Sequence, residues 1–554
     1  MTAQKPLRIV VIGGVAAGAT AAARMRRLDE RAEITIIEKG PYVSFANCGL
    51  PYFISGDIRR RSHLLLQTPE GFFSRYRVNV RTGAEAVAID RSRKTILVRT
   101  SNGEESIPYD KLLLAQGGAP VVPPVPGSTL GHVFRLWTIP DMDRIQKFID
   151  ERKPASAVVA GGGFVGLEMA EALRARGIAV TVVELAPQVM IQMDPEFGAM
   201  VKAGLGEQGV AVRTGAGISS IGEESVTLAD GSVVKADLVL LSVGVRPELS
   251  LAKAAGLETG PSGGLVVDET MRTADPDIYA AGDMVEIVHR VHGRRMRIPL
   301  AGPANRQGRI AGTNILGGSM KYRGALGTSV VKLFNRTAAS TGLTEKAASE
   351  AGIPAGVAYV FKDNHVAYYP GGTPVALKIV YDTVTRRLLG GQAYGEAGVE
   401  KRIDVLATAL QGGFTLDDLA ELDLAYAPPY NSANDPVNMA AFIGLNHVSG
   451  YSPLRTPAGA ASEMRSGGGI VLDVRTIGEQ SKAPLAGALH IPADELRDRI
   501  DEVPKDTPVY ILSKDGFLGH TSLRILRAAG WPQVFNITGG HAAARWFPEW
   551  NFTA

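Results

Sequence analysis

Cysteine is almost absent from this chain, which holds a single thiol, Cys48, among 554 residues. One thiol excludes an internal disulfide framework and a zinc site built from several thiolates. It also excludes an intramolecular redox dithiol. The nine histidines show neither an HExxH motif nor a paired spacing, so we expect no metal.

Strong charge of one sign and long apolar runs are missing as well. The 59 lysines and arginines nearly balance 56 aspartates and glutamates, and the net charge of +3 gives no reason to expect a nucleic-acid or membrane surface. The first apolar run, residues 7–12, is too short for a secretory signal, and no later run reaches about 18 residues. We therefore predict a soluble, cytoplasmic chain of about three to five domains.

A glycine-rich turn follows the first apolar run. Residues 7–12 are rich in β-branched side chains, which favour a strand, and residues 19–28 favour a helix. Small residues between a strand and a helix let the backbone approach a pyrophosphate at the helix N-terminus. A second strand, residues 33–37, ends in a carboxylate that can accept hydrogen bonds from a ribose. The predicted cofactor-binding residues here are Gly13, Gly14, Val15, Ala16, Ala17, Gly18, Glu38 and Lys39.

The same pattern recurs further along the chain. Residues 157–160 precede a full GxGxxG motif, formed by Gly161, Gly163 and Gly166, and a strand at 179–183 ends in Glu184. Two such units predict two dinucleotide sites. Because a carboxylate repels a 2′-phosphate, the second site should prefer NADH, although the nearby Arg174 and Arg176 leave NADPH possible.

Three further segments complete a family pattern. They are LLLAQGG at 112–118, which includes Gly117, GVRP at 244–247, and IYAAGD at 278–283, which ends in Asp283. With the two glycine loops, they resemble the pyridine nucleotide-disulfide oxidoreductase family over residues 7–445. The resemblance implies that the first loop binds FAD, with Asp283 on the ribityl chain, and that the second loop binds NAD(P)H.

The only cysteine lies in the segment SFANCGLPY, residues 44–52. Pro51 fits only the first turn of a helix, so a helix should begin beside Cys48 and lower the pKa of its thiol. The segment resembles the coenzyme A-disulfide reductase and NADH-dependent persulfide reductase branch, which implies that Cys48 is catalytic and forms a mixed disulfide or persulfide. Two alternatives stay open: an NADH oxidase or peroxidase that cycles Cys48 through sulfenic acid, and a non-catalytic flavoprotein redox sensor.

Two tyrosine-rich segments, residues 367–372 and 425–430, resemble the dimerisation domain of that branch. The resemblance implies a homodimer in which Tyr368 and Tyr426 approach the flavin and cysteine of the other subunit, with Tyr369 and Tyr430 as alternatives.

Coenzyme A, as substrate or mixed-disulfide adduct, is also implied by the resemblance. The residues in the positions that contact it are Thr20, Arg24, Arg27, Ser44 and Asn47. The sequence departs from the pattern at three places, Tyr76, Asn305 and Asn434, where the branch offers lysine, histidine and lysine. Nearby arginines, including Arg59, Arg60, Arg61, Arg75 and Arg77, are candidates to replace that charge.

The C-terminal part resembles a rhodanese domain. Rhodaneses carry sulfane sulfur on a cysteine, but Ser513 stands in that position, and Leu518 stands where an arginine is common. A serine cannot form a persulfide, so we expect no sulfur transfer by this domain. The Pro/Gly/Ala-rich composition of the preceding segment predicts a linker.

The expected fold is α/β, with two Rossmann-like dinucleotide-binding domains, an α+β dimerisation domain and a C-terminal α/β rhodanese-like domain. The expected boundaries are 1–125 and 251–325 for the FAD domain, 126–250 for the NAD(P)H domain, 326–448 for the dimerisation domain, 449–463 for the linker and 464–554 for the rhodanese-like domain.

Overall fold

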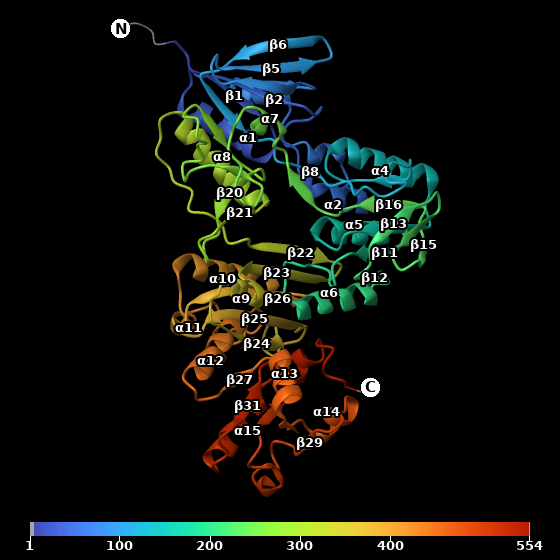
Figure 1. Cartoon of the computed structure of the whole chain (residues 1–554), viewed down its shortest axis with the longest axis vertical. Helices are drawn as coiled ribbons and strands as arrows, with labels where there is room; N and C mark the ends of the chain where they lie inside the picture. Colours follow the sequence, from blue (N-terminus) through green and yellow to red (C-terminus); the bar gives the residue numbers. More distant parts are fainter. Residues whose placement is uncertain (1–4, 553–554) are drawn as a thin grey trace. The chain divides into compact units, whose positions relative to one another are not determined.

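A computed structural model describes residues 5–552 (Figure 1). The chain divides into two compact units. The first contains the chain up to Pro187 together with Gly209–Gly327, and the second contains Gln188–Gln208 together with the chain from Thr328 onward. Each unit is described by itself.

The first unit opens with a parallel five-stranded sheet in the order β19-β7-β1-β2-β3. Its strands are β1 (Arg8–Ile12), β2 (Glu33–Glu38), β3 (Val78–Thr82), β7 (Lys111–Leu114) and β19 (Ile278–Ala280). Helices α1 (Ala16–Leu28) and α8 (Ala301–Ile315) lie side by side (Figure 1). A Cβ on Gly308 would overlap the carbonyl oxygen of Ala17, so the glycine permits this close packing.

A second parallel sheet, in the order β12-β11-β10-β16-β9, belongs to the same unit. Its strands are β9 (Val133–Phe134), β10 (Ser156–Ala160), β11 (Ala179–Glu184), β12 (Ala211–Thr214) and β16 (Leu238–Leu241). Helices α4 (Ile139–Arg152) and α5 (Phe164–Ala175) accompany it. Thr138 and Asp141 form a capping box that starts α4.

Short elements connect and cover these two sheets. The helical ones are η1 (Asn47–Gly49), α2 (Leu50–Ser55), η2 (Arg61–Leu64), α3 (Pro69–Tyr76) and α7 (Ser250–Ala254). The strands are β4 (Glu85–Asp90), β5 (Thr95–Thr100), β6 (Gly103–Pro108), β8 (Gly118–Pro120), β13 (Ile218–Ile221), β14 (Ser225–Leu228), β15 (Val233–Lys235), β17 (Val245–Pro247), β18 (Leu265–Val266), β20 (Val285–Val288) and β21 (Arg295–Met296).

The second unit contains an antiparallel sheet in the order β22-β23-β26-β25-β24. Its strands are β22 (Ser329–Leu333), β23 (Arg336–Gly342), β24 (Ala355–Asp363), β25 (Pro374–Asp382) and β26 (Leu388–Gly395). Its helices are α9 (Glu345–Glu350), α10 (Val399–Gly412), α11 (Leu416–Ala420) and α12 (Pro436–Val448). Helix α6 (Pro195–Glu207) also belongs to this unit, although the chain enters and leaves it between β11 and β12.

A separate parallel sheet, in the order β27-β31-β30-β28-β29, forms the C-terminal part. Its strands are β27 (Leu454–Arg455), β28 (Ile470–Asp473), β29 (Leu489–His490), β30 (Val509–Leu512) and β31 (Val534–Ile537). The helices are α13 (Pro457–Gly467), α14 (Ile477–Lys482), α15 (Phe517–Ala528), α16 (Gly540–Ala544) and the short η3 (Ile500–Glu502).

The segment predicted to be a linker, residues 449–463, contains regular secondary structure. Strand β27 and most of helix α13 fall inside residues 449–463. Thr456 caps α13 by accepting a hydrogen bond from the backbone N–H of Gly459, Pro457 occupies the first turn, and Ala460 and Ala461 are buried. The composition that suggested a flexible connection is also that of a capped helix with small buried side chains.

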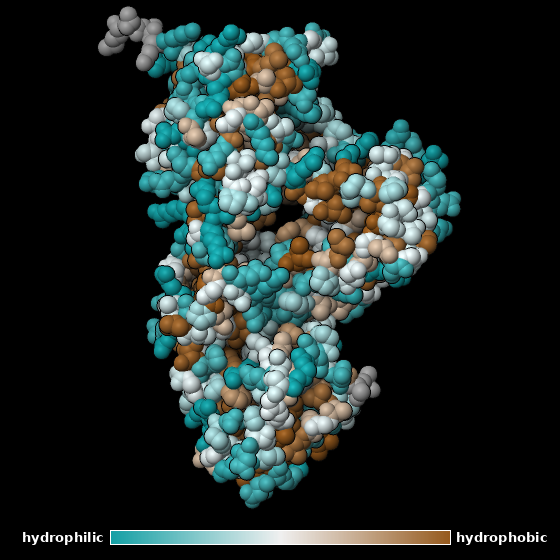
Figure 2. Space-filling model, in the orientation of Figure 1, coloured by the Kyte–Doolittle hydropathy of each residue, from teal (hydrophilic) through white to brown (hydrophobic). Residues whose placement is uncertain are grey.

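Polar and apolar residues are interspersed over the visible surface, where brown groups interrupt a largely teal and white face (Figure 2). Within residues 5–552, no helix combines the length and apolar character needed to cross a bilayer. Over the same residues, no group of three or more histidine, cysteine, aspartate or glutamate side chains is arranged to hold a metal ion.

Candidate functional site

The first glycine loop joins β1 to α1. Gly13 has a φ of +97°, which favours glycine, and a Cβ on Gly18 would overlap the carbonyl oxygen of Gly13. Glu38, at the end of β2, accepts hydrogen bonds from the backbone N–H groups of Gly14 and Gly40, both at 2.8 Å. Burial raises the pKa of Glu38, and these two hydrogen bonds oppose that rise. The carboxylate is thereby held against the loop that starts α1.

The second glycine loop, between β10 and α5, has the same construction. Gly161 has a φ of +107°, and a Cβ on Gly166 would overlap its carbonyl oxygen. Glu184, at the end of β11, accepts from the N–H of Gly162 at 2.6 Å and from that of Ala186 at 2.8 Å. Gly163 precedes α5 with open space where a Cβ would be. Backbone groups at this helix N-terminus can approach a phosphate closely.

The residues beside the first loop fit a flavin nucleotide. Among the described residues, the buried Oε1 of Gln116 has no hydrogen-bond partner, which leaves an acceptor for a ligand N–H or hydroxyl. Gly117 has a φ of +66°. Asp283 is half-buried, and burial raises the pKa of its carboxyl group while Arg297 opposes the rise. Lys39, by contrast, forms an exposed ion pair with Glu85 at 2.7 Å.

Cys48 lies in η1, directly before α2, and its side chain is exposed. Pro51 occupies the first turn of α2, as predicted. The expectation of a lowered thiol pKa is wrong for this structure. Although the residue is exposed, desolvation by the surrounding protein raises the pKa of Cys48, and the nearby carboxylates of Glu168 and Asp283 raise it further. Helix α2 spans only six residues and begins after the cysteine, so its dipole is weak compared with these effects.

Hydrogen bonds fix α2 to the neighbouring helix α5. The Tyr52 hydroxyl donates to Glu168 Oε1 at 3.2 Å, and Arg176 Nη1 donates to the carbonyl oxygen of Ile54 at 3.1 Å. The segment that presents Cys48 is therefore tied to the helix that follows the second glycine loop.

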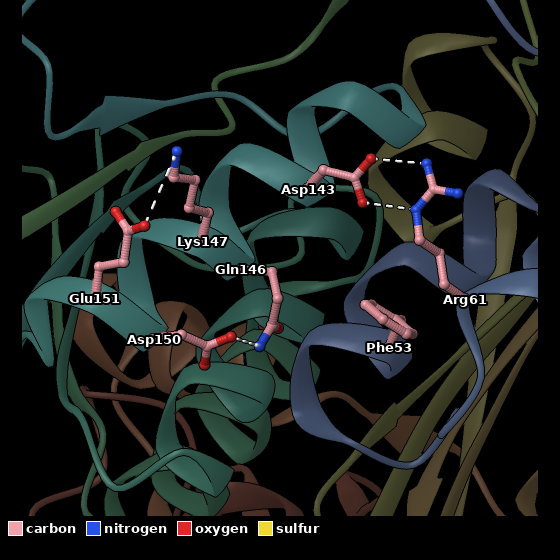
Figure 3. Close-up of a pocket in the computed structure, with 7 residues that line it drawn as sticks. All are labelled: Phe53, Arg61, Asp143, Gln146, Lys147, Asp150 and Glu151. Carbon is pink, nitrogen blue, oxygen red and sulfur yellow. Dashed lines mark hydrogen bonds and ion pairs between the residues drawn. The ribbon is translucent and has the colours of Figure 1, made fainter.

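Paired polar side chains line an open pocket beside α2. Arg61 reaches Asp143 of α4 through two contacts of 2.8 Å, and Gln146 donates to Asp150 at 2.8 Å (Figure 3). The remaining lining residues are Phe53, Lys147 and Glu151. The Arg61–Asp143 pair links η2 to α4, whereas the other contacts lie within α4. Arg61 in particular is already bound to Asp143 and to the Tyr42 hydroxyl.

Three of the predicted coenzyme A contacts share one side of α1. Thr20 donates to Asn305 Oδ1 at 2.6 Å, and Arg24 donates to Thr313 Oγ1 at 3.1 Å, so both lie beside α8. Arg27 follows at the next helical turn and is exposed. Ser44 has a φ of +47° and donates its backbone N–H to the carbonyl oxygen of Gly14 at 2.8 Å. Asn47 begins η1.

The two predicted catalytic tyrosines are neighbours in the second unit. The hydroxyl groups of Tyr368 and Tyr426 form a 2.9 Å hydrogen bond, which raises the pKa of Tyr368. Their side chains are 74% and 46% exposed. The alternatives Tyr369 and Tyr430 are also exposed, at 40% and 72%.

Ser513 lies at the end of β30, at the base of the loop before α15. It is fully buried, and its hydroxyl accepts a 2.9 Å hydrogen bond from the N–H of Gly516. Its carbonyl oxygen accepts a 2.7 Å bond from the N–H of His541. The hydroxyl is thus held inside the loop.

Sequence reasoning missed Tyr52, Glu168 and Gln116 as residues of this region. Tyr52 and Glu168 are 116 positions apart. Tyr52 ends the segment that carries Cys48, Gln116 lies within residues 112–118, and Glu168 follows the GxGxxG motif, but no pattern within these motifs assigned a role to any of the three. Their proximity to Cys48 and to the second glycine loop is the one signal that the sequence offers.

Two glycine loops of matching construction, each closed by a carboxylate, in a unit that also presents a lone cysteine define a redox protein that handles two dinucleotides. Residues 7–308 match the family model of pyridine nucleotide-disulphide oxidoreductase, and residues 328–436 match its dimerisation domain. The chain belongs to the pyridine nucleotide-disulphide oxidoreductase family. This membership implies FAD and NAD(P)H as cofactors. Residues 456–544 match the rhodanese-like domain.

Similar proteins match most of the chain. It is 36% identical to an NAD(P)H coenzyme A polysulfide/persulfide reductase of Pyrococcus horikoshii, over 79% of this chain and 98% of that protein. It is 35% identical to a coenzyme A disulfide reductase of Staphylococcus haemolyticus, over 78% and 98%. A solved structure described as reduced Bacillus anthracis CoADR-RHD is 43% identical, with a TM-score of 0.95 and 98% of each chain covered. The expected family and fold class are confirmed.

Proposed function

We propose that this protein is an FAD-dependent NAD(P)H reductase of coenzyme A disulfide, coenzyme A persulfide or polysulfide, and that it works as a homodimer through Cys48. The observation that carries the proposal is the position of the chain's only thiol, exposed before α2 and tied to the helix of the second glycine loop. The names of the two relatives and the dimerisation domain support it.

Cys48 performs the sulfur chemistry. Its thiolate attacks one sulfur of the substrate disulfide, a Cys48–S–S–R bond forms and the first thiolate leaves. FAD, when bound, would supply the electron pair taken from NAD(P)H. Cleavage of the mixed disulfide takes up that electron pair and one proton, releases the second thiol and restores the Cys48 thiolate. Since no second cysteine exists, the substrate must provide the sulfur partner of Cys48.

The remaining residues bind and orient. Gly13 to Gly18, Glu38, Gly117 and Asp283 would hold FAD, while Gly161, Gly163, Gly166 and Glu184 would hold the nicotinamide nucleotide. Thr20, Arg24, Arg27, Ser44 and Asn47 would face coenzyme A. Tyr368 and Tyr426 would serve the Cys48 of the other subunit, where a hydroxyl can donate a hydrogen bond to a leaving thiolate. Their exposure and mutual hydrogen bond support this role.

Turnover with defined acceptors tests the proposed function. The holoenzyme should oxidise NADH under anaerobic conditions with coenzyme A disulfide, coenzyme A persulfide or polysulfide, much faster than it consumes oxygen or peroxide. Oxygen or peroxide consumption at an equal rate would favour the oxidase or peroxidase alternative. Absence of turnover with all of these acceptors would favour the redox sensor.

NADH should be preferred over NADPH because Glu184 is held at the second loop. Glu184→Gln removes the charge that repels a 2′-phosphate, and we expect the ratio of kcat/KM for NADH to that for NADPH to fall about tenfold, or 1.4 kcal/mol. Steady-state kinetics with both coenzymes on the same preparation measure this ratio, so each variant is its own control. An unchanged ratio would show that Glu184 does not select the coenzyme.

The tyrosine pair should matter for turnover more than for coenzyme binding. We expect Tyr368→Phe/Tyr426→Phe to lower kcat with coenzyme A disulfide by about 10²-fold, because a positioned hydrogen-bond donor is lost, and to leave the KM for NADH unchanged. Tyr451→Phe is the matched control, since Tyr451 is another exposed tyrosine of the same unit, at 48%. Full activity of the double variant would exclude the proposed role.

A further inference from the structure

A short chain of side chains links Cys48 to the second glycine loop. Tyr52 stands on α2, the helix that begins directly after the cysteine, and its hydroxyl donates to Glu168 on α5 at 3.2 Å. Helix α5 starts at Phe164, after Gly163 of the GxGxxG motif. Glu168 therefore lies within the first turns of a nucleotide-binding helix and faces the segment that carries the thiol.

The carboxyl group of Glu168 is not an ordinary surface acid. Burial raises its pKa to about 7, and the neighbouring Glu171 adds to the rise, while the Tyr52 hydrogen bond opposes it. Burial and the same carboxylate raise the pKa of Tyr52 well above its usual range, so the phenol remains a donor. Glu168 can consequently change charge near neutral pH, the range in which a thiol also begins to ionise.

The charge on Glu168 acts on the thiol. Burial is the first cause of the raised pKa of Cys48, Glu168 is the second and Asp283 the third. Two negative charges that face each other in a partly desolvated region disfavour one another. A charge on Glu168 should therefore oppose the formation of a thiolate at Cys48.

We propose that Glu168, held by Tyr52, is a positioning residue whose carboxylate opposes a charge on Cys48 and takes up a proton when Cys48 becomes a thiolate. The exchange conserves charge, because the thiol and the carboxylate become a thiolate and a carboxylic acid. The inference rests on Cys48 as the reacting group of the proposed function.

The same proton balances the chemical steps. When the Cys48 thiolate attacks the substrate disulfide, the new S–S bond is neutral, Glu168 ionises and its proton passes to the leaving thiolate. The electron pair and proton delivered as hydride from NAD(P)H then split the mixed disulfide into the Cys48 thiolate and a second thiol. One proton from solvent reprotonates Glu168. The sum is NAD(P)H, one proton and a disulfide converted to NAD(P)⁺ and two thiols.

Alkylation of Cys48 tests the inference without turnover. The rate of reaction of the reduced holoenzyme with iodoacetamide should be measured from pH 6 to pH 9. At pH 6 Glu168 is largely protonated, so Glu168→Gln should react at close to the wild-type rate. At pH 8 the wild-type carboxylate retards thiolate formation, so Glu168→Gln should react about three- to tenfold faster, equivalent to a pKa difference of about half a unit to one unit.

Two more variants separate charge from structure. Tyr52→Phe removes the donor that stabilises the ionised Glu168, so its rate at pH 8 should fall between those of the wild type and Glu168→Gln. Glu151→Gln changes an exposed carboxylate of α4 and should leave the profile unchanged. Superimposable profiles for wild type and Glu168→Gln would overturn the inference, as would an equal acceleration at every pH, which indicates loosened packing. Because alkylation needs no disulfide substrate, a failure of the proposed function would be seen separately.

Discussion

Cys48→Ser is expected to lower disulfide-dependent NADH oxidation by about 10³-fold or more. A serine hydroxyl is not ionised at neutral pH and its oxygen does not exchange with disulfides, whereas the thiolate does. The chain offers no substitute, because Cys48 is its only thiol and Ser513 occupies the corresponding position of the rhodanese-like domain. Turnover with coenzyme A disulfide under anaerobic conditions measures the loss.

The controls for this variant are its FAD content and the reduction of its flavin by NADH. Cys48 is exposed, so the substitution should leave the fold and FAD content unchanged, and NADH should still bleach the flavin absorbance. Retention of more than a tenth of the wild-type turnover by a variant with full FAD content would contradict the cysteine mechanism.

Lys378→Met is expected to destabilise the second unit by about 3–5 kcal/mol. Lys378 is fully buried on β25, and its ammonium group lies 2.8 Å from Asp194 and 2.7 Å from Glu196, which are themselves buried. Burial alone would lower the pKa of Lys378, but the Tyr359 phenol and the carboxylates of Glu196, Asp194 and Glu345 raise it well above its usual range. Without the lysine, two buried carboxylates lose their cation.

The loss should far exceed that caused by removing an exposed lysine. Denaturant unfolding of the variant beside Lys362→Met, an exposed lysine of the same sheet, measures it. The control should change stability by less than about 0.5 kcal/mol. Equal stability of both variants would show that the buried charges do not anchor α6.

Local motifs were predictable because their causes are local. Gly13 and Gly18 belong to one short loop, and Gly161 and Gly166 belong to another. The strand, turn and helix around each loop follow from its own short segment. Pro51 likewise indicated where α2 begins.

Features that depend on distant residues were not predictable in the same way. The pKa of Cys48 is raised by Glu168 and Asp283, which the fold brings from other segments, so the helix start alone pointed in the wrong direction. Helix α6 joins the second unit through the buried partners of Lys378, and its position in the sequence between two strands of the first unit suggested otherwise. At α13, the Pro/Gly/Ala-rich composition suggested a linker, whereas the capping residue Thr456 was the better indicator of a helix.

The most direct test of a single-cysteine reductase is the intact mass of the purified protein, measured after incubation with coenzyme A disulfide and again after addition of NADH. Incubation with coenzyme A disulfide should add one coenzyme A to Cys48, NADH should remove it from the FAD-loaded enzyme, and Cys48→Ser should acquire none. An unmodified Cys48 after that incubation, or an oxygen adduct in place of coenzyme A or sulfane sulfur, would contradict the single-cysteine mechanism.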